Sequence, residues 1–246
     1  MKKIFGSVIT IVIAFVMIMI MSFTVVSCSA EEINNSIYLT NASTYVGEEF
    51  NVNLEVKTNN SCIAYDVLLR YDAQLELINI EGSQASYVFV DKNGDKCVSL
   101  VGYSSSVFED GKVVTLTFIA PQTIQNNYEA FRIEFKGIYN FCGEEKDFED
   151  FVYTNSLVYI ASNKDFKILI DDKQESIVGY RGDIDNNNEL NIRDAAMISR
   201  LCSTGEINSV SETESFFADV NEDGKVNVRD AAAIARHLAS SDKEWN

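Results

Sequence analysis

An internal repeat near the C-terminus constrains the fold of this chain more than any other feature. Residues 183–194 read DIDNNNELNIRD, and residues 219–230, which start 36 positions later, read DVNEDGKVNVRD. Each acidic stretch runs into a segment, AAMISR or AAAIAR, whose apolar residues recur at helical spacing. The repeat therefore predicts two acidic loops, each opening a helix.

The residue types in these loops are those of a calcium-binding loop. Calcium takes about six to eight oxygen ligands, and a twelve-residue loop offers them from positions 1, 3, 5, 7, 9 and 12, with position 7 giving its backbone carbonyl. In the first loop these positions are Asp183, Asp185, Asn187, Glu189, Asn191 and Asp194. In the second they are Asp219, Asn221, Asp223, Lys225, Asn227 and Asp230. The sequence predicts two structural calcium ions, because a chance acidic turn would not match in both repeats.

The two loops differ at position 6. The sharp turn there requires a left-handed backbone, which Gly224 adopts more readily than Asn188. We therefore expect the first site to be the weaker one. Leu190 and Val226, both at position 8, are expected to pair and hold the loops together.

The N-terminus has the order of an export signal. Lys2 and Lys3 precede an apolar run over residues 4–26, and small residues follow. Cleavage after Ala30 would release the protein, whereas cleavage before Cys28 would leave a lipid-anchored cysteine. An uncleaved membrane anchor is the third alternative, because the run is about long enough to span a bilayer. We favour removal, and hence a secreted, extracellular protein that meets a membrane only if Cys28 is lipidated.

Composition excludes several classes of protein. The formal net charge of −17 argues against a nucleic-acid partner, because carboxylates repel phosphates. Beyond the signal, the cysteine spacings match no zinc motif, and we expect small buried apolar residues rather than a disulfide framework. These cysteines are Cys62, Cys97, Cys142 and Cys202.

Residues 33–160 read as a succession of strands. In residues 50–56, for example, Phe50, Val52, Leu54 and Val56 alternate with polar residues, the period of a half-buried strand. Short strands separated by turn signals predict an antiparallel sandwich. The other expected strands are 36–40, 63–71, 75–80, 87–90, 97–103, 113–120, 131–135 and 157–160.

The paired loops resemble the type I dockerin module, which docks secreted proteins onto cohesin modules in cellulosomes. The resemblance covers residues 182–239 and implies a small all-α domain with EF-hand-like calcium loops, in which calcium is structural. It also implies that the tenth and eleventh loop residues and a basic residue on each helix contact a cohesin. Those residues are Ile192, Arg193 and Arg200 in the first repeat, and Val228, Arg229 and Arg236 in the second. Because the two sets are nearly interchangeable, the module is expected to dock in two orientations.

The strand region resembles a cohesin. Residues 63–72, IAYDVLLRYD, look like the strand and Tyr-Asp signature of that family, and residues 110–118 look like its later Asp-Gly strand. The usual proline after the Tyr-Asp pair is Ala73 here. The resemblance implies a jelly-roll sandwich with a dockerin-binding sheet face that includes Asp66, Leu100 and Tyr103.

The sequence thus predicts a non-catalytic cellulosome adaptor with four parts. These are a signal at 1–30, a cohesin-like sandwich at 31–162, a linker with room for one strand at 163–180, and a dockerin at 181–241. Its expected partners are a scaffold cohesin for the dockerin and a dockerin-bearing enzyme or scaffold protein for the sandwich. The alternative is a carbohydrate-binding module or a small enzyme that carries a dockerin, and a calcium sensor ranks last. The alternative is disfavoured because a sugar-binding face presents exposed tryptophan or tyrosine rings, and the only tryptophan is Trp245.

Overall fold

The computed structural model describes residues 35–58, 62–106, 108–170, 176–240 and 245. The expected export segment, with Cys28, lies outside the described residues. Within the described ranges, the helices are too short or too polar to cross a bilayer.

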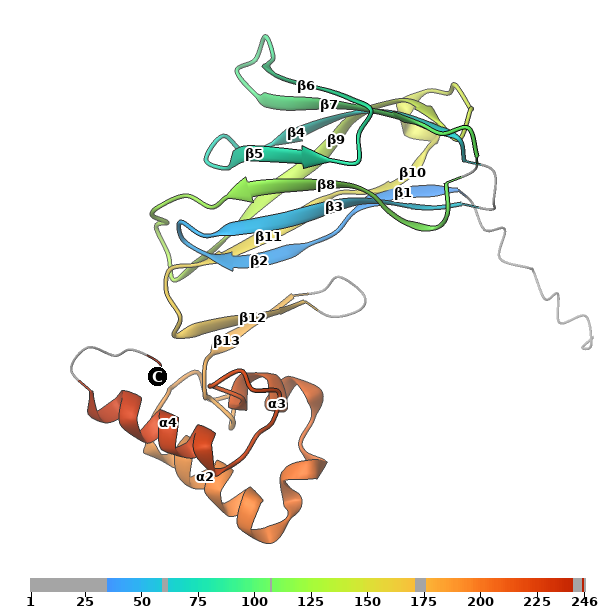
Figure 1. The fold of residues 1–246 in the computed structure, drawn as a ribbon. Coiled ribbons are helices and arrows are strands. Elements are labelled where there is room, and N and C mark those ends of the chain that lie inside the picture. The colour runs from blue at the N-terminus through green and yellow to red at the C-terminus, as the bar shows by residue number, and fades with distance from the viewer. Residues whose placement is uncertain (1–34, 59–61, 107, 171–175, 241–244, 246) are drawn as a thin grey trace, which may run out of the picture. The chain divides into compact units, whose positions relative to one another are not determined.

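The first two thirds of the described chain form a sandwich of two sheets (Figure 1). One sheet has the strand order β10-β1-β3-β8-β5, and the other has the order β2-β11-β9-β4-β7-β6. The first sheet consists of β1 (Ser36–Leu39), β3 (Glu49–Lys57), β5 (Glu76–Glu81), β8 (Gly111–Ile119) and β10 (Val152–Thr154). The second consists of β2 (Ala42–Tyr45), β4 (Ala64–Tyr71), β6 (Ala85–Val90), β7 (Lys96–Tyr103), β9 (Tyr128–Phe141) and β11 (Ser156–Ala161).

The first and last strands of the sandwich cross between the sheets side by side. The chain leaves β1 in one sheet and enters β2 in the other, and β10 and β11 make the same step in parallel with them. At the crossing, Ser156 Oγ donates to the carbonyl of Thr40 at 2.7 Å, and the amide of Leu157 donates to Asn41 Oδ1 at 2.7 Å. Because Ser156 is fully buried, these bonds satisfy polar groups inside the sandwich.

Alternation along the strands builds the core, as the sequence predicts. Phe50, Val52, Leu54 and Val56 of β3 are all buried, and the polar residues between them face outward. The ring of Phe118 on β8 stacks on that of Phe50, with centroids 5.6 Å apart. The predicted sandwich is confirmed, with two parallel strand pairs in an otherwise antiparallel arrangement.

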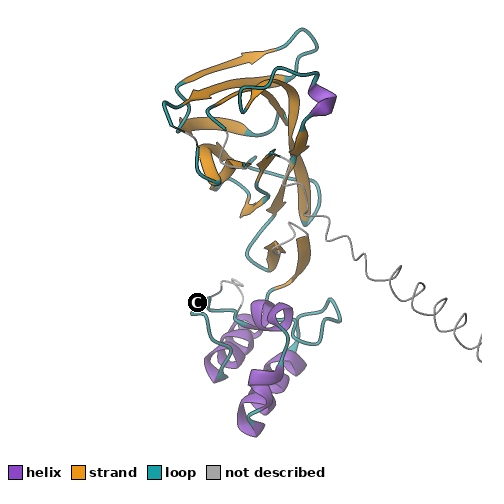
Figure 2. Cartoon of the chain, turned by 90° about the vertical axis from the view of Figure 1, so that its right-hand side faces the viewer, coloured by secondary structure: helices purple, strands orange, loops and turns teal. Residues whose placement is uncertain are grey.

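A two-stranded hairpin and a helical region follow the sandwich (Figure 2). The hairpin pairs β12 (Phe166–Ile170) with β13 (Ser176–Tyr180), in the segment where the sequence suggested one extra strand. The helices are α2 (Ile192–Thr204), α3 (Glu212–Ala218) and α4 (Val228–Ala239). Short 3-10 turns lie at Phe148–Asp150 and Glu206–Ser209.

The helical region has its own apolar cluster. Ile198 and Leu201 from α2 pack with Ala231 and Ile234 from α4, and Leu190 and Val226 border the same cluster. The two loop residues at position 8 thus border one apolar cluster, and their direct pairing stays a prediction.

The repeat does not predict helix α3, which lies between the two repeats. Its signal is local, since Ser211 and Glu214 form a capping box in which each side chain accepts the other's backbone amide.

Candidate calcium loops and partner surfaces

The two acidic loops are folded by the same set of backbone-to-carboxylate hydrogen bonds. In the first loop, Asp183 accepts from the amides of Asn187 at 3.1 Å and Asn188 at 2.8 Å. In the second, Asp219 accepts from the amides of Asp223 at 3.2 Å and Gly224 at 2.9 Å. These bonds curl each loop around the carboxylate at position 1, which turns its oxygen atoms inward.

The last loop residue also starts the helix that follows. Asp194 Oδ2 accepts from the amide of Asn191 at 2.9 Å, and Asp230 Oδ2 accepts from that of Asn227 at 2.8 Å. Both asparagines cap their helix in return, so each helix begins with a complete capping box. One carboxylate therefore serves the loop and the helix at once.

The remaining oxygen of this carboxylate differs between the loops. Asp230 Oδ1 accepts from the amides of Val220 at 3.1 Å and Asn221 at 3.4 Å. Asp194 Oδ1 is buried without a hydrogen-bond partner of good geometry among the described residues. The equivalent amides, those of Ile184 and Asp185, still favour the charged form of Asp194 and lower its pKa. A buried carboxylate oxygen that lacks a partner is costly unless a cation occupies the space in front of it.

Acidic side chains converge in the first loop. Ligand atoms of Asp183, Asp185 and Asp194 lie within 4.8 Å of one another. Burial raises the pKa of Asp183 and Asp194, and the neighbouring carboxylates raise it further. Burial also raises the pKa of Asp230 in the second loop. Without a cation, the folded loops thus concentrate negative charge where it is poorly solvated.

These residues fit calcium. The donors are carboxylate, amide and carbonyl oxygens only, the set that a hard divalent cation prefers. The predicted ligand positions 1, 3 and 12 converge in the first loop through its three aspartates, and the second loop repeats the same hydrogen bonds. Bound calcium would supply the positive charge that allows the carboxylates to lie together.

The backbone of the two loops turns left-handed at the same places. Asn186 and Asn188 have φ values of +55° and +63°, and Glu222 and Gly224 have values of +59° and +80°. Asn188 therefore adopts the conformation that position 6 requires, at the steric cost that a glycine avoids.

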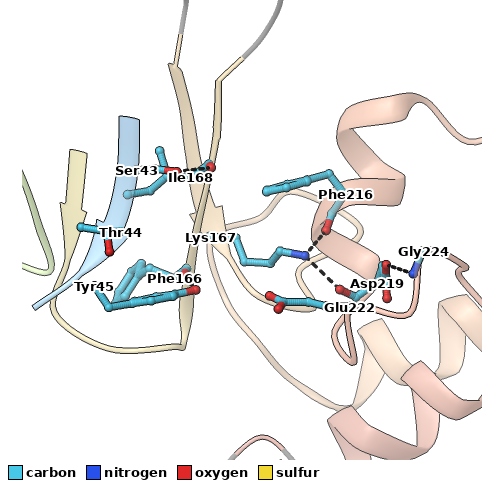
Figure 3. A pocket seen from close by; sticks show the side chains of 10 residues that line it. All are labelled: Ser43, Thr44, Tyr45, Phe166, Lys167, Ile168, Phe216, Asp219, Glu222 and Gly224. Carbon is cyan, nitrogen blue, oxygen red and sulfur yellow. Dashed lines mark hydrogen bonds between the residues drawn. The ribbon is translucent and has the colours of Figure 1, made fainter. Parts of the chain in front are cut away.

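Two buried cations, one on the hairpin and one directly after it, brace the second loop. Lys167 Nζ donates to the carbonyls of Phe216 at 2.6 Å and Asp219 at 2.9 Å (Figure 3). Arg181 donates to the carbonyl of Val220 at 2.9 Å and forms an ion pair with Glu222. Burial lowers the pKa of Lys167, and the charge of Arg181 lowers it further.

The predicted cohesin contacts lie on the surface of the helical region. Ile192 is 62 % exposed and Val228 is 60 % exposed, although both are large apolar side chains at the first position of a helix. The arginine beside each is also exposed, as are Arg200 and Arg236. The repeat thus places the same apolar and basic side chains on the surface twice.

The predicted sandwich contacts, on the paired strands β4 and β7, divide between the two faces of the six-stranded sheet. Tyr103 is 66 % exposed and Asp66 is partly exposed, on the outer face of the six-stranded sheet. Leu100 was predicted for this face, but this is wrong, because Leu100 pairs with Val67 and both side chains are fully buried in the core.

The structure identifies two outer-face residues that the sequence did not. Val101 is the cross-strand partner of Asp66, and Tyr139, 58 % exposed, extends its ring over Gly137. Strand parity alone could not choose between Leu100 and Val101.

Comparison with known protein families gives one match. Residues 181–239 match the family model of the dockerin type I domain, which supports calcium as the ion of the two loops. The chain matches no curated protein.

Comparison with solved structures returns cohesins. The seventh ScaB type I cohesin of Pseudobacteroides cellulosolvens is 19 % identical, with 53 % of this chain and 94 % of that chain covered and a TM-score of 0.42. The Coh-OlpA–Doc918 complex of Clostridium thermocellum gives 12 % identity, 52 % and 99 % coverage and a TM-score of 0.43. A non-cellulosomal cohesin of Archaeoglobus fulgidus gives 18 % identity, 52 % and 92 % coverage and a TM-score of 0.39.

Proposed function

We propose that this protein is a non-catalytic, exported adaptor of a cellulosome-type assembly. Its calcium-loaded C-terminal module, residues 181–241, docks onto a cohesin of a scaffold protein. Its sandwich, residues 31–162, receives a dockerin-bearing partner. The protein would therefore change which partner a scaffold site accepts, without carrying out chemistry itself.

The observation that carries the proposal is the paired calcium-loop module and its duplicated surface. Ile192 and Val228 are exposed at equivalent positions, each followed by an exposed arginine. An exposed apolar side chain beside an arginine is typical of the energetically important centre of a protein interface. The match of residues 181–239 to the dockerin model supports the same interpretation.

Calorimetry with the full chain tests the docking half. A panel of type I cohesins is titrated into the protein in calcium and then in chelator, and binding is expected only in calcium. Replacing Ile192 and Arg193 by aspartate should weaken one docking orientation, and replacing Val228 and Arg229 should weaken the other. If both orientations are used, only the quadruple variant loses binding, by roughly 100-fold or more. Binding that survives in the quadruple variant and in chelator contradicts the proposal.

The receiving half has its own test. Asp66→Lys on the outer face of the six-stranded sheet should abolish binding of a dockerin from a matching panel. Lys112→Glu, an exposed residue on β8 of the other sheet, is the control and should bind normally. Equal loss in both variants would place the partner elsewhere.

Exposed tyrosines favour a second candidate function for the sandwich, carbohydrate binding. Tyr87 and Tyr103 are 69 % and 66 % exposed, and Tyr139 is 58 % exposed, all on strands of the six-stranded sheet. Aromatic faces of this kind stack on sugar rings. Pull-down on cellulose and xylan, compared with pull-down on immobilised dockerins, separates the two functions.

A further inference from the structure

Two cysteines lie at one end of the central strands of the six-stranded sheet. Cys62 is fully buried and lies just before β4, and the half-buried Cys142 directly follows β9. Strands β4 and β9 are hydrogen-bonded neighbours, and Tyr65 pairs with Phe141 at this end. The register therefore brings two sequence-distant thiols to the same place.

Both cysteines contact a single backbone carbonyl. The amide of Cys142 donates to Ala64 O at 2.9 Å, and the thiol of Cys62 lies 3.5 Å from the same oxygen. The two thiols also form a hydrogen bond with each other. Cys142 has a φ of +57° and is followed by Gly143 with a φ of +82°, so it lies in a tight left-handed turn.

The chemistry at the two sulfurs is unequal. The hydrogen bond from Cys142 lowers the pKa of the Cys62 thiol, and the same contact raises the pKa of Cys142. A dissolved oxidant reaches the half-buried Cys142 first, and the buried Cys62 thiol, whose pKa is lowered, is placed to resolve the mixed disulfide.

The other two described cysteines have different surroundings. Cys97 on β7 lies opposite Arg70 of β4 and Phe89 of β6. Cys202 on α2 borders the apolar cluster of the helical region. They serve as internal controls for the pair at the end of the sheet.

We propose that Cys62 and Cys142 form an intramolecular disulfide that fastens β4 to β9 when the protein meets a small-molecule disulfide oxidant. The Cys142 thiolate attacks one sulfur of the oxidant and releases one thiolate, which takes up the Cys62 proton. The Cys62 sulfur then displaces the second half of the oxidant from Cys142. Two protein thiols are oxidised and one disulfide is reduced to two thiols.

The consequence for the sheet is local. The bond closes a chain segment of about 80 residues, and a cross-link of a long segment restricts the unfolded chain strongly. It also anchors the end of β9 that carries Tyr139, on the outer face where Asp66 lies. The inference does not depend on the proposed function, because it concerns the chain alone.

Peptide mapping of the full chain tests the proposal. The protein is incubated with glutathione disulfide, its free thiols are alkylated under denaturing conditions, and the digest is analysed by mass spectrometry. We expect one cross-linked peptide that joins residues 62 and 142, two hydrogens lighter than the reduced pair, while Cys97 and Cys202 are alkylated. The same digest shows whether Cys28, where it is present, is alkylated or cross-linked. Alkylation of both Cys62 and Cys142, a glutathione adduct that persists on either, or a different pairing overturns the proposal.

Matched variants and a thermal measurement give the second readout. Oxidation should raise the unfolding temperature of the sandwich by several degrees, and a reductant should reverse the rise. Cys62→Ala and Cys142→Ala should lose the shift, whereas Cys97→Ala and Cys202→Ala should keep it. If a variant fails to fold, the wild-type peptide map decides alone. A cross-link without any thermal shift would overturn the claim that it fastens the strands.

Discussion

The two acidic loops share a residue pattern and a hydrogen-bond pattern, yet different groups hold them in place. In the first loop, three carboxylates lie within 4.8 Å of one another, and one buried oxygen of Asp194 lacks a partner among the described residues. In the second, Asp230 Oδ1 receives two amides, and Lys167 and Arg181 hold the carbonyls that lead into the loop. The first loop therefore depends on a bound cation more than the second, which already has cations of its own.

The comparison also changes the expectation about affinity. Position 6 alone suggested that the first site is the weaker one. The carboxylate cluster acts in the opposite direction, because carboxylates that already lie together bind calcium more tightly than the same number held apart. The charge of Lys167, next to Asp219, opposes a second cation there. The relative affinity of the two sites stays a prediction that the following measurements decide.

Calcium removal should have the largest effect. Without cations the loop carboxylates repel, and α2 and α4 should lose most of their helical circular dichroism while the sandwich keeps its strands. Hydrogen exchange in chelator should show less protection in the first loop than in the second. Equal protection in the two metal-free loops would contradict the difference between them.

Asp194→Asn should come next in size. It removes the charge that faces the cluster but retains an oxygen that can cap α2, so calcium affinity at the first loop should fall by roughly 100-fold. Asp230→Asn, the equivalent change, leaves the buried amides of Val220 and Asn221 with a weaker acceptor and should destabilise the metal-free form as well. Isothermal calorimetry and thermal unfolding in chelator separate the two effects. Equal losses of metal-free stability would contradict the difference.

Lys167→Met tests the brace on the second loop. Its loss leaves two carbonyls without their donor, which should cost about 1–3 kcal/mol in the metal-free protein. Calcium binding at the second loop should become tighter, because a neighbouring positive charge is gone. Lys164→Met is the matched control, because that side chain is exposed on the same hairpin segment. Chemical denaturation of both variants in chelator provides the measurement.

The pH dependence of the metal-free protein should be reversed by calcium. Burial raises the pKa of Asp183, Asp194 and Asp230 in the folded state, so folding takes up protons between the ordinary carboxyl pKa of about 4 and the raised values. The stability that these groups contribute is present at low pH and is lost as the pH rises through the raised pKa. In chelator, the unfolding temperature of the helical region should therefore rise as the pH is lowered from 7 to 5. In calcium, the unfolding temperature should fall over the same range, because protons compete with the ion for the carboxylates.

Asn188→Gly should give the smallest change. It relieves the left-handed backbone of the first loop and should stabilise that loop by up to about 1 kcal/mol. Gly224→Asn, the reciprocal change, should cost a similar amount in the second loop. Thermal unfolding in calcium measures both, and effects of unequal size would show that the loops differ in rigidity at position 6.

Local patterns predicted what local physics controls. Two acidic loops that each open a helix, and the alternation along β3, follow from spacing alone, and the structure has both. The metal ligands stay a prediction. Leu100 was misplaced because alternation gives two faces without saying which is the core, and only pairing with Val67 resolves it. The role of Lys167 could not be predicted, because a lysine in a mixed polar segment indicates a solvated linker. Its acceptor in the second loop lies 52 positions away in the sequence and is brought close only by the fold.

Asp194 and Asp230 each hold an oxygen toward the loop and the other toward the first turn of a helix. The ion and the helix thus depend on one side chain, so neither forms well alone. A half-assembled module would expose its apolar faces to proteases and to wrong partners. Sharing the carboxylate makes such a state short-lived, because calcium binding and helix formation occur together. The partner-binding surface therefore forms in the same step as the calcium site.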